Sequence, residues 1–302
     1  MMVLALALWA LTACALASEA QAAPRADPHF ILLVARLAAE GFERESVARL
    51  FSEPGVVYDP SSMGKKIRAL YRMRYAPPAP LSEALQDPNR RRTKLWEPHL
   101  TPEMLARLKV FRAKYATSLA SAEKKYGVPQ SVILAVLVVE TKLGQFLGEN
   151  SVFNVLASMA VCTNPEDVAE FLAAYEVTPE QRAWLASRQR DKADWAYEEL
   201  KSLIAYAIGN GLDPTTMSGS IYGAFGMCQF IPSTAIRLAV DGDGDGTADL
   251  NHPPDAVHSV AKFLKCAGWK AKMSRRAKIK AVKRYNPDLF YAKTVLSVAD
   301  QL

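Results

Sequence analysis

Cysteine is scarce in this sequence, with four residues among 302. Three of them follow the N-terminal leader, and that number allows at most one internal disulfide. Their spacing matches no zinc site, and no neighbouring residue marks a Cys/His nucleophile pair. We therefore expect these three to act as small buried hydrophobic residues: Cys162, Cys228 and Cys266.

Charged side chains are absent from the first 18 residues. Residues 1–22, within "MMVLALALWALTACALASEAQAAP", are typical of a secretory leader that is removed from the mature protein. Two cleavage sites compete: "LTAC" resembles a bacterial lipobox that would leave Cys14 lipidated, and "AQA" resembles an ordinary signal-peptidase site after Ala22. We expect the protein in the periplasm or cell envelope, either free or tethered by a lipid at Cys14. No later segment is long and apolar enough to span a bilayer.

Acidic residues are missing between Lys262 and Arg284, a segment with ten basic residues. Such a run indicates either a solvated helical face or a surface for an acidic partner. Nucleic acid is not the expected partner, because the sequence has no zinc finger, no RNP-like motif and no clear interleaving of aromatic and basic residues.

Strand-like alternation of polar and apolar residues is almost absent after the leader. Helical patterns are frequent instead: Thr101 and Pro102 begin one helix, Pro129 begins another, and apolar residues recur three and four apart between Thr178 and Gly209. This pattern predicts a mainly α-helical protein. The expected division of the chain has three parts: a leader at 1–22, an N-terminal helical portion at 28–125 and a second helical portion at 126–302.

One carboxylate interrupts an apolar helical run, "VPQSVILAVLVVETKLG". Apolar residues occupy both faces of this helix, so we expect it to be buried on all sides and Glu140 to lose water near its C-terminal end. Loss of water raises a carboxyl pKa, and the negative end of the helix dipole acts in the same direction. A carboxylic acid that stays protonated near neutral pH can serve as a general acid. The alternative is a glutamate that faces solvent or pairs with Lys142.

Two later segments carry polar side chains that suit a carbohydrate. In "SGSIYGAFGMCQFIPSTAIRLA", glycines permit close backbone approach and Gln229 supplies an amide among apolar neighbours. In "KRYNPDLFYAKTV", Tyr285 and Asn286 place a ring and an amide at a turn before Pro287. An acid, a glycine-rich loop with an amide, and an aromatic residue with an amide suit a polyol polymer better than a small anion.

This ordered set of segments resembles the lytic murein transglycosylases of the membrane-bound lytic transglycosylase B type, within the lysozyme-like group. The resemblance runs from about residue 28 to the C-terminus, through "YGVPQSVILAVLVVETKLGQFLG", "SVFNVLASMA", "GAFGMCQFIPS" and "DGDGDGTADLNHPPDAVHSVAKFLKCAGW". It implies a lysozyme-like helical catalytic core with helical N-terminal and C-terminal portions. It also implies Glu140 as the single catalytic acid and base, and four residues that contact sugar: Ser220, Gln229, Tyr285 and Asn286.

The resemblance implies a reaction on peptidoglycan glycan strands that requires no cofactor. The enzyme would cleave the β-1,4 bond between N-acetylmuramic acid and N-acetylglucosamine and form 1,6-anhydro-N-acetylmuramic acid, with the substrate's acetamido group in place of a protein nucleophile. Two alternatives stay open: a lysozyme-type hydrolase with a second acid such as Asp213 or Glu149, and a non-catalytic peptidoglycan-binding scaffold. For each of the four sugar contacts, the alternative is a purely structural role.

The stretch "DGDGDGTADLNH" at 241–252 resembles an EF-hand loop. Oxygen ligands fall at positions one, three, five, seven and nine, the spacing that a structural calcium or another hard cation needs: Asp241, Asp243, Asp245, the Thr247 carbonyl and Asp249. Position twelve is His252 in place of the usual glutamate, and Asp255 could substitute only if the intervening prolines bend the chain back. The alternative is a metal-free surface turn held by Asx-type hydrogen bonds.

Overall fold

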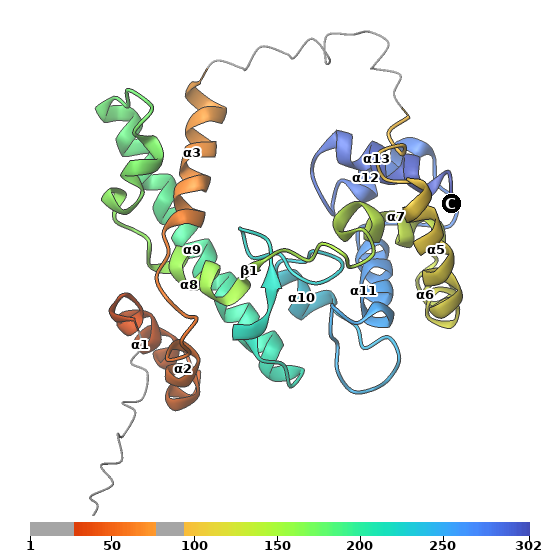
Figure 1. Cartoon of the computed structure of the whole chain (residues 1–302), viewed down its shortest axis with the longest axis horizontal. Coiled ribbons are helices and arrows are strands. Elements are labelled where there is room, and N and C mark those ends of the chain that lie inside the picture. The colour runs from red at the N-terminus through yellow and green to blue at the C-terminus, as the bar shows by residue number, and fades with distance from the viewer. Residues whose placement is uncertain (1–26, 77–93) are drawn as a thin grey trace, which may run out of the picture.

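The computed structural model describes residues 27–76 and 94–302 (Figure 1). The leader at 1–22, with Cys14, lies outside the described residues. The described part is mainly α-helical, as the sequence predicts, and has two short antiparallel strands, β1 at Asn150–Ser151 and β2 at Ser218–Gly219. No described helix combines the length and the apolar character that a membrane crossing requires.

The helices are spread over the whole described chain, with η denoting a 3₁₀ helix. Those before the midpoint are η1 (Pro28–Phe30), α1 (Ile31–Ala39), α2 (Arg44–Phe51), α3 (Ser61–Tyr75), α5 (Pro102–Lys114), α6 (Ala116–Tyr126) and α7 (Gln130–Thr141). Those after it are α8 (Val152–Val161), η3 (Pro165–Leu172), α9 (Pro179–Gly209), η4 (Pro214–Thr216), α10 (Pro232–Leu238), α11 (Pro253–Cys266), α12 (Arg275–Val282) and α13 (Leu289–Ala299).

Local sequence signals explain where several helices begin and end. The Thr101 side chain accepts a hydrogen bond from the N–H of Met104 at the start of α5. Thr178 and Gln181 form a reciprocal capping box at the start of α9. α6 ends at Gly127, whose φ of 69° is left-handed and suits glycine. The helix starts at Thr101 and Thr178 agree with the ones read from the sequence.

The helices form two groups (Figure 1). In one group α3 packs on η3 and α9, and α8 packs along α9. In the other, α11 packs on α6 and α7, and α13 packs on α7 and α12. β1, β2 and the segment that leads from β2 to α10 lie between the two groups. This arrangement brings the C-terminal end of α7 against α13, which follows it by about 150 residues in the chain.

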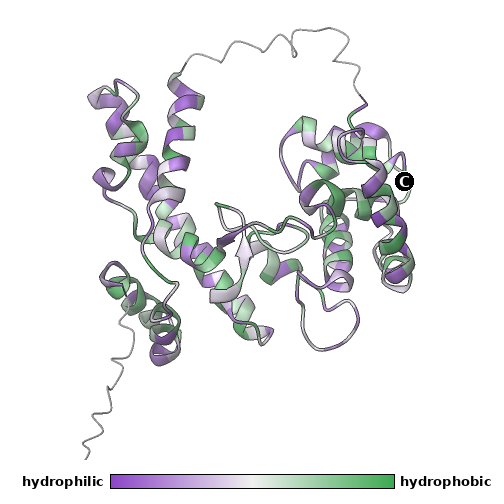
Figure 2. Cartoon of the chain, viewed as in Figure 1, coloured by the Kyte–Doolittle hydropathy of each residue, from purple (hydrophilic) through white to green (hydrophobic). Residues whose placement is uncertain are grey.

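α7 is buried on every side along most of its length. Its residues from Val132 to Val138 are buried, and Figure 2 shows the helix as mainly hydrophobic. Val139 and Glu140 are partly buried. The predicted burial of this helix is confirmed. Its one acid, Glu140, lies at the partly buried C-terminal end.

The three cysteines after the leader are all free thiols. Cys162 and Cys228 are buried, as expected. The expectation is wrong for Cys266, which is exposed at the C-terminal end of α11. The chain beyond this helix end turns back through Gly268 to bury Trp269 instead, so the thiol itself stays outside the core.

Candidate active site

Glu140 occupies the last turn of α7, just before the chain leaves the helix. Lys142, Leu143 and Gly144 follow it with left-handed φ values of 50°, 60° and 85°. The N–H groups of Lys142 and Leu143 donate to carbonyl oxygens of the last helical turn, both at 3.0 Å. Non-glycine residues adopt this backbone only at a cost that the surrounding structure must offset. The sharp exit leaves the Glu140 side chain facing the neighbouring helix.

Tyr291, on the first turn of α13, donates a hydrogen bond from its hydroxyl to Oε1 of Glu140. The ring of Tyr285 lies nearly parallel to the ring of Tyr291, with the centroids 6.4 Å apart and 13° between the planes. The hydroxyl of Tyr285 donates to the carbonyl oxygen of Cys228. Tyr291 therefore contacts Glu140. Tyr285, whose ring is stacked with that of Tyr291, contacts the segment that follows β2.

Tyr291 is the functional candidate that sequence reasoning missed. A partial signal was present: Asp288 caps α13 by accepting from the N–H of Tyr291 at 2.6 Å, so this tyrosine is fixed in the first helical turn. The packing of α13 on α7 had no signal in the sequence, because the two helices are far apart in the chain.

Burial raises the pKa of Glu140 to about 7, and the hydrogen bond from Tyr291 partly opposes this increase. Lys142, the nearest cation in sequence, is exposed, and its ammonium lies 4.5 Å from the ring centroid of Phe146. Among the described residues Glu140 takes part in no ion pair. The alternative in which Lys142 neutralises Glu140 is therefore wrong, and the carboxyl group can be protonated near neutral pH.

The glycine-rich loop, residues 220–231, is fastened to the end of α7. The hydroxyl of Thr141 donates to the carbonyl of Met227 at 2.9 Å and accepts from the N–H of Gly144 at 3.1 Å. The side-chain amide of Gln229 donates to the carbonyls of Leu147 and Gly226, both at 3.1 Å. These bonds hold the loop beside Glu140.

Each of the other predicted sugar contacts has a partner within the protein. Ser220 Oγ accepts from the N–H groups of Tyr222 and Ala224, at 3.3 and 3.1 Å. Asn286 Oδ1 accepts from the N–H of Asp288 at 3.1 Å, in the turn before α13. The structure thus places Tyr285 beside Tyr291, the side chain that contacts Glu140. Gln229 lies in the adjoining loop, and Ser220 closes a turn at the start of that loop.

Neither candidate for a second acid forms a hydrogen bond to Glu140 among the described residues. Asp213 caps η4, where one of its oxygens accepts from the N–H and the hydroxyl of Thr215 at 2.9 and 2.7 Å. Glu149 is exposed just before β1. A second carboxylate close to Glu140 would raise its pKa by repulsion, but the groups that shift this pKa do not include Asp213 or Glu149.

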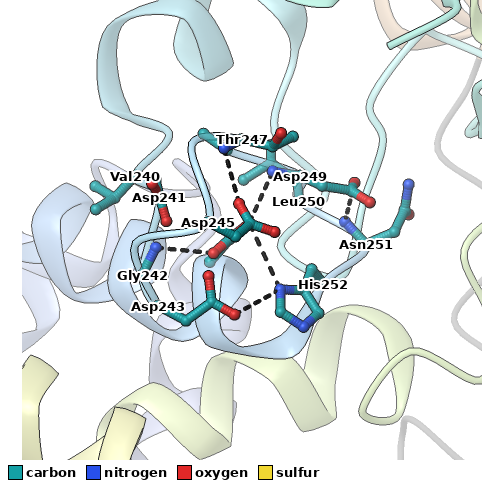
Figure 3. Close-up of polar contacts among 12 residues, drawn as sticks. Val240, Asp241, Gly242, Asp243, Asp245, Thr247, Asp249, Leu250, Asn251 and His252 are labelled. Carbon is teal, nitrogen blue, oxygen red and sulfur yellow. Dashed lines mark hydrogen bonds and ion pairs between the residues drawn. The ribbon is translucent and has the colours of Figure 1, made fainter. Parts of the chain in front are cut away.

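The segment 241–252 forms a compact loop whose carboxylates converge (Figure 3). Asp241 accepts from the N–H groups of Gly244 and Gly246 at 2.6 and 2.9 Å. Asp245 accepts from the N–H of Thr247, and Asp249 from the N–H of Asn251, both at 2.8 Å. The turn-type hydrogen bonds expected of a metal-free loop are therefore present.

The prolines do bend the chain back, so that Asp255 lies at the base of this loop. Asp255 is buried, and its two oxygens accept from the N–H groups of Gly242 and Asp249 at 2.8 Å. One oxygen each from Asp241, Asp243 and Asp255 lie within 4.8 Å of one another. Nδ1 of His252 lies 3.5 Å from Oδ2 of Asp243. Figure 3 marks this contact with a dashed line. A cluster dominated by carboxylate oxygens fits a hard cation such as calcium, and His252 does not improve that fit.

The fold and the site define a class of mainly helical proteins in which the buried helix ends with a carboxylic acid of raised pKa that accepts a hydrogen bond from a tyrosine hydroxyl. The family described as Transglycosylase SLT domain matches residues 31–281 of the sequence. The chain belongs to this family.

Three known proteins show the extent of the similarity. The membrane-bound lytic murein transglycosylase B of Escherichia coli strain K12 is 30% identical over 170 residues, which cover 56% of this chain and 40% of that protein. The Escherichia coli lytic transglycosylase SLT35 in complex with calcium has a TM-score of 0.64 and 20% identity, with 90% of this chain and 92% of that one covered. SltB3 from Pseudomonas aeruginosa, in complex with NAG-anhNAM-pentapeptide, has a TM-score of 0.64 and 20% identity, with 89% and 77% covered.

Proposed function

We propose that this chain is a peptidoglycan lytic transglycosylase in which Glu140 is both the acid and the base. The observation that carries the proposal is a carboxyl group whose pKa burial raises to about 7, held by the hydroxyl of Tyr291. A group with this pKa can give up a proton and take one back at neutral pH. Membership of the transglycosylase family supports the same reading.

In the first step, protonated Glu140 gives its proton to the oxygen of the β-1,4 bond between N-acetylmuramic acid and N-acetylglucosamine. The bond between C1 and that oxygen breaks, and the acetamido carbonyl oxygen of the muramoyl residue forms a bond to C1. Because the substrate supplies the nucleophile, the protein needs no second carboxylate. The Tyr291 hydroxyl stabilises the carboxylate that Glu140 becomes.

In the second step, the Glu140 carboxylate takes the proton from the muramoyl C6 hydroxyl. The C6 oxygen bonds to C1, and the bond between C1 and the acetamido oxygen breaks. The product is a 1,6-anhydro ring, Glu140 is protonated again, and no water is consumed. The reaction so written requires no cofactor.

The proposed sugar contacts use the hydrogen-bond donors and acceptors that the bonds described above leave free. Ser220 Oγ accepts two hydrogen bonds, so its own hydroxyl proton is free to donate to a sugar. The amide nitrogen of Gln229 is engaged, and its carbonyl oxygen is available to accept from a sugar hydroxyl. Tyr285 offers a ring beside Tyr291, and Asn286 offers its amide nitrogen at the adjoining turn.

The substrate we propose is the glycan strand of peptidoglycan with its attached peptides, the class of ligand present in the SltB3 complex. Export by the leader at 1–22 would place the enzyme in the periplasm, with Cys14 as the site of a lipid anchor if the lipobox operates. The N-terminal portion at 28–125 and the core at 126–302 would then lie within the mature protein.

We further propose that the loop at 241–252 binds calcium as a structural ion. Asp241, Asp243 and Asp245 would hold it together with the Thr247 carbonyl, while Asp255 would take the place that His252 cannot fill. Asp249 would support the loop through its hydrogen bond to Asn251. A bound calcium would neutralise the converging carboxylates and brace the adjoining glycine-rich loop, because the N–H of Met227 donates to the carbonyl of Leu250 at 2.9 Å.

The proposal is tested by Glu140→Gln, which keeps the shape of the side chain and removes the titrating proton. Clearance of purified peptidoglycan should fall by roughly a hundred- to ten-thousand-fold, the range for loss of a general acid. Glu149→Gln and Asp213→Asn are the matched controls and should keep the activity of the parent. Undiminished clearance by Glu140→Gln would rule out the assignment. A loss of similar size in either control would favour a hydrolase with two acids.

A further inference from the structure

Between Lys262 and Arg284 the chain has ten basic residues and no acid, and the proposed reaction uses none of these cations. The run covers the end of α11, the whole of α12 and the start of the turn before α13. Among the described residues one of the ten forms an ion pair: Nη1 of Arg275 lies 2.6 Å from Oδ2 of Asp300. The run is therefore a source of largely uncompensated positive charge, which attracts anions.

α12 and α13 form an antiparallel helical hairpin (Figure 1). Arg275, at the start of α12, donates to the carbonyl of Leu296 and to the carboxylate of Asp300, which lie at the far end of α13. The end of α12 consequently lies beside the start of α13, and a short turn joins them. We call this end of the hairpin, residues 280–290, the hairpin tip.

The hairpin tip combines exposed cations with exposed apolar side chains. An open hollow of about 590 Å³ runs from α12 onto the turn, and its lining includes no acid. At the start of α13, 47% of Leu289 and 65% of Phe290 are exposed. The one acid of the tip, Asp288, is engaged as the cap of α13. Four of the seven residues that line the hollow are cations: Arg276, Lys280, Lys283 and Arg284.

This combination fits the surface of an anionic bilayer. Phosphate oxygens of lipid head groups accept hydrogen bonds from lysine and arginine, and each cation near such a surface adds to the attraction. Exposed aromatic and aliphatic side chains beside the cations can enter the boundary between the head groups and the acyl chains. A soluble polyanion would meet the cations and leave Leu289 and Phe290 in water.

We propose that the hairpin tip docks the folded protein on an anionic phospholipid bilayer. The cations that line the hollow contact the head groups, and Leu289 and Phe290 enter the interface. This contact requires no lipid on Cys14 and does not depend on the proposed reaction. Tyr285 lies in the turn of the hairpin and Tyr291 in the first turn of α13, so docking holds the proposed active site beside the membrane surface.

The test is the partition of the protein, by flotation over a series of lipid concentrations, onto vesicles of phosphatidylcholine alone and of phosphatidylcholine mixed with phosphatidylglycerol. Every protein carries Cys14→Ser, so that no lipid anchor is attached. The parent should bind the mixed vesicles far more tightly than the neutral ones, and salt should weaken that binding. Lys280→Gln combined with Lys283→Gln should weaken it about 25-fold, about fivefold for each cation. Phe290→Ala should weaken it about tenfold, because an apolar side chain no longer enters the interface.

Lys124→Gln combined with Lys125→Gln is the matched control, because it removes two exposed lysines from α6. This variant should bind the mixed vesicles as the parent does. Equal binding of the parent to both kinds of vesicle would overturn the proposal, as would an equal loss in the control. Unchanged vesicle binding in the variant at Lys280 and Lys283, together with weaker sedimentation with purified peptidoglycan, would assign the surface to the wall and not to the membrane. Unchanged binding in Phe290→Ala would reduce the tip to a site for soluble polyanions and would also contradict docking.

Discussion

Glu140 and Tyr291 act as one unit at the residue scale. Burial raises the pKa of both groups, so each is in its neutral form at pH values where an exposed carboxyl would be ionised. The hydroxyl of Tyr291 favours the charged form of Glu140 and keeps the pKa increase from being larger. In the proposed mechanism, Glu140 gives a proton in the first step and holds a charge afterwards, and the two opposing effects on its pKa suit both states.

The charge on Glu140 should make the parent less stable at high pH. The folded-state pKa of about 7 lies above the ordinary 4.5, so the folded protein loses stability as pH rises through the window between these values. Glu140→Gln removes this loss and should be more stable than the parent at pH 8 by up to about 3 kcal/mol, with little difference at pH 4.5. Urea unfolding of both proteins at the two pH values measures the effect. A constant difference across this range would contradict the raised pKa.

Tyr291→Phe should change the pH profile as well as the rate. Loss of the hydrogen bond removes the effect that lowers the pKa of Glu140, so the alkaline limb of activity should move to higher pH. The rate should fall by about tenfold, as for one lost charge-assisted hydrogen bond. Tyr285→Phe is the control: it loses its bond to Cys228 and should lower activity without moving the limb. Identical pH profiles for Tyr291→Phe and the parent would show that Tyr291 does not set the proton affinity of Glu140.

At the element scale, the pairing of β1 with β2 holds the chain between the two helix groups. The backbones of Gly148 and Gly219 approach closely there. Gly148, just before β1, has a φ of 97°, and a Cβ placed on it would lie 2.1 Å from the carbonyl oxygen of Gly219 in β2. Gly41, between α1 and α2, has a φ of 98° but no atom within 4 Å of such a Cβ. The two glycines share a backbone conformation and differ in packing.

Alanine substitutions at Gly41 and Gly148 separate the cost of backbone strain from the cost of a steric clash. Gly41→Ala should lower the free energy of unfolding by about 1 kcal/mol, from the left-handed backbone alone. Gly148→Ala should cost more than about 4 kcal/mol, because the strands must also move apart. Denaturant unfolding of the two variants measures both values. Equal losses would show that β1 and β2 do not need this close approach.

Calcium should stabilise the loop at 241–252 and the elements attached to it. Free calcium at about 100 times the dissociation constant should add about 2.7 kcal/mol to the free energy of unfolding and raise the melting temperature above that in chelator. Asp243→Ala combined with Asp245→Ala should abolish the increase, whereas Asp194→Ala, at an exposed position in α9, should keep it. Identical melting curves with millimolar calcium and with chelator would sink the proposal.

At the scale of the whole molecule, the sequence shows local features well and long-range contacts poorly. The buried helix of Glu140, the caps at Thr101 and Thr178 and the converging aspartates follow from patterns within a few residues. The contact between Tyr291 and Glu140 joins helices that are far apart in the chain, and no local pattern encodes it. The same holds for Asp255, whose return to the loop depends on a bend that the prolines permit without requiring.

The central claim is that a single carboxyl group runs a reaction without water, and the mass of the released fragments tests it most directly. Purified protein should be incubated with peptidoglycan, and the soluble fragments analysed by mass spectrometry. The mechanism predicts fragments that end in 1,6-anhydro-N-acetylmuramic acid, each one water lighter than the corresponding hydrolytic fragment. Fragments with reducing ends alone would contradict the mechanism, because they would require an activated water and hence a second group beside Glu140.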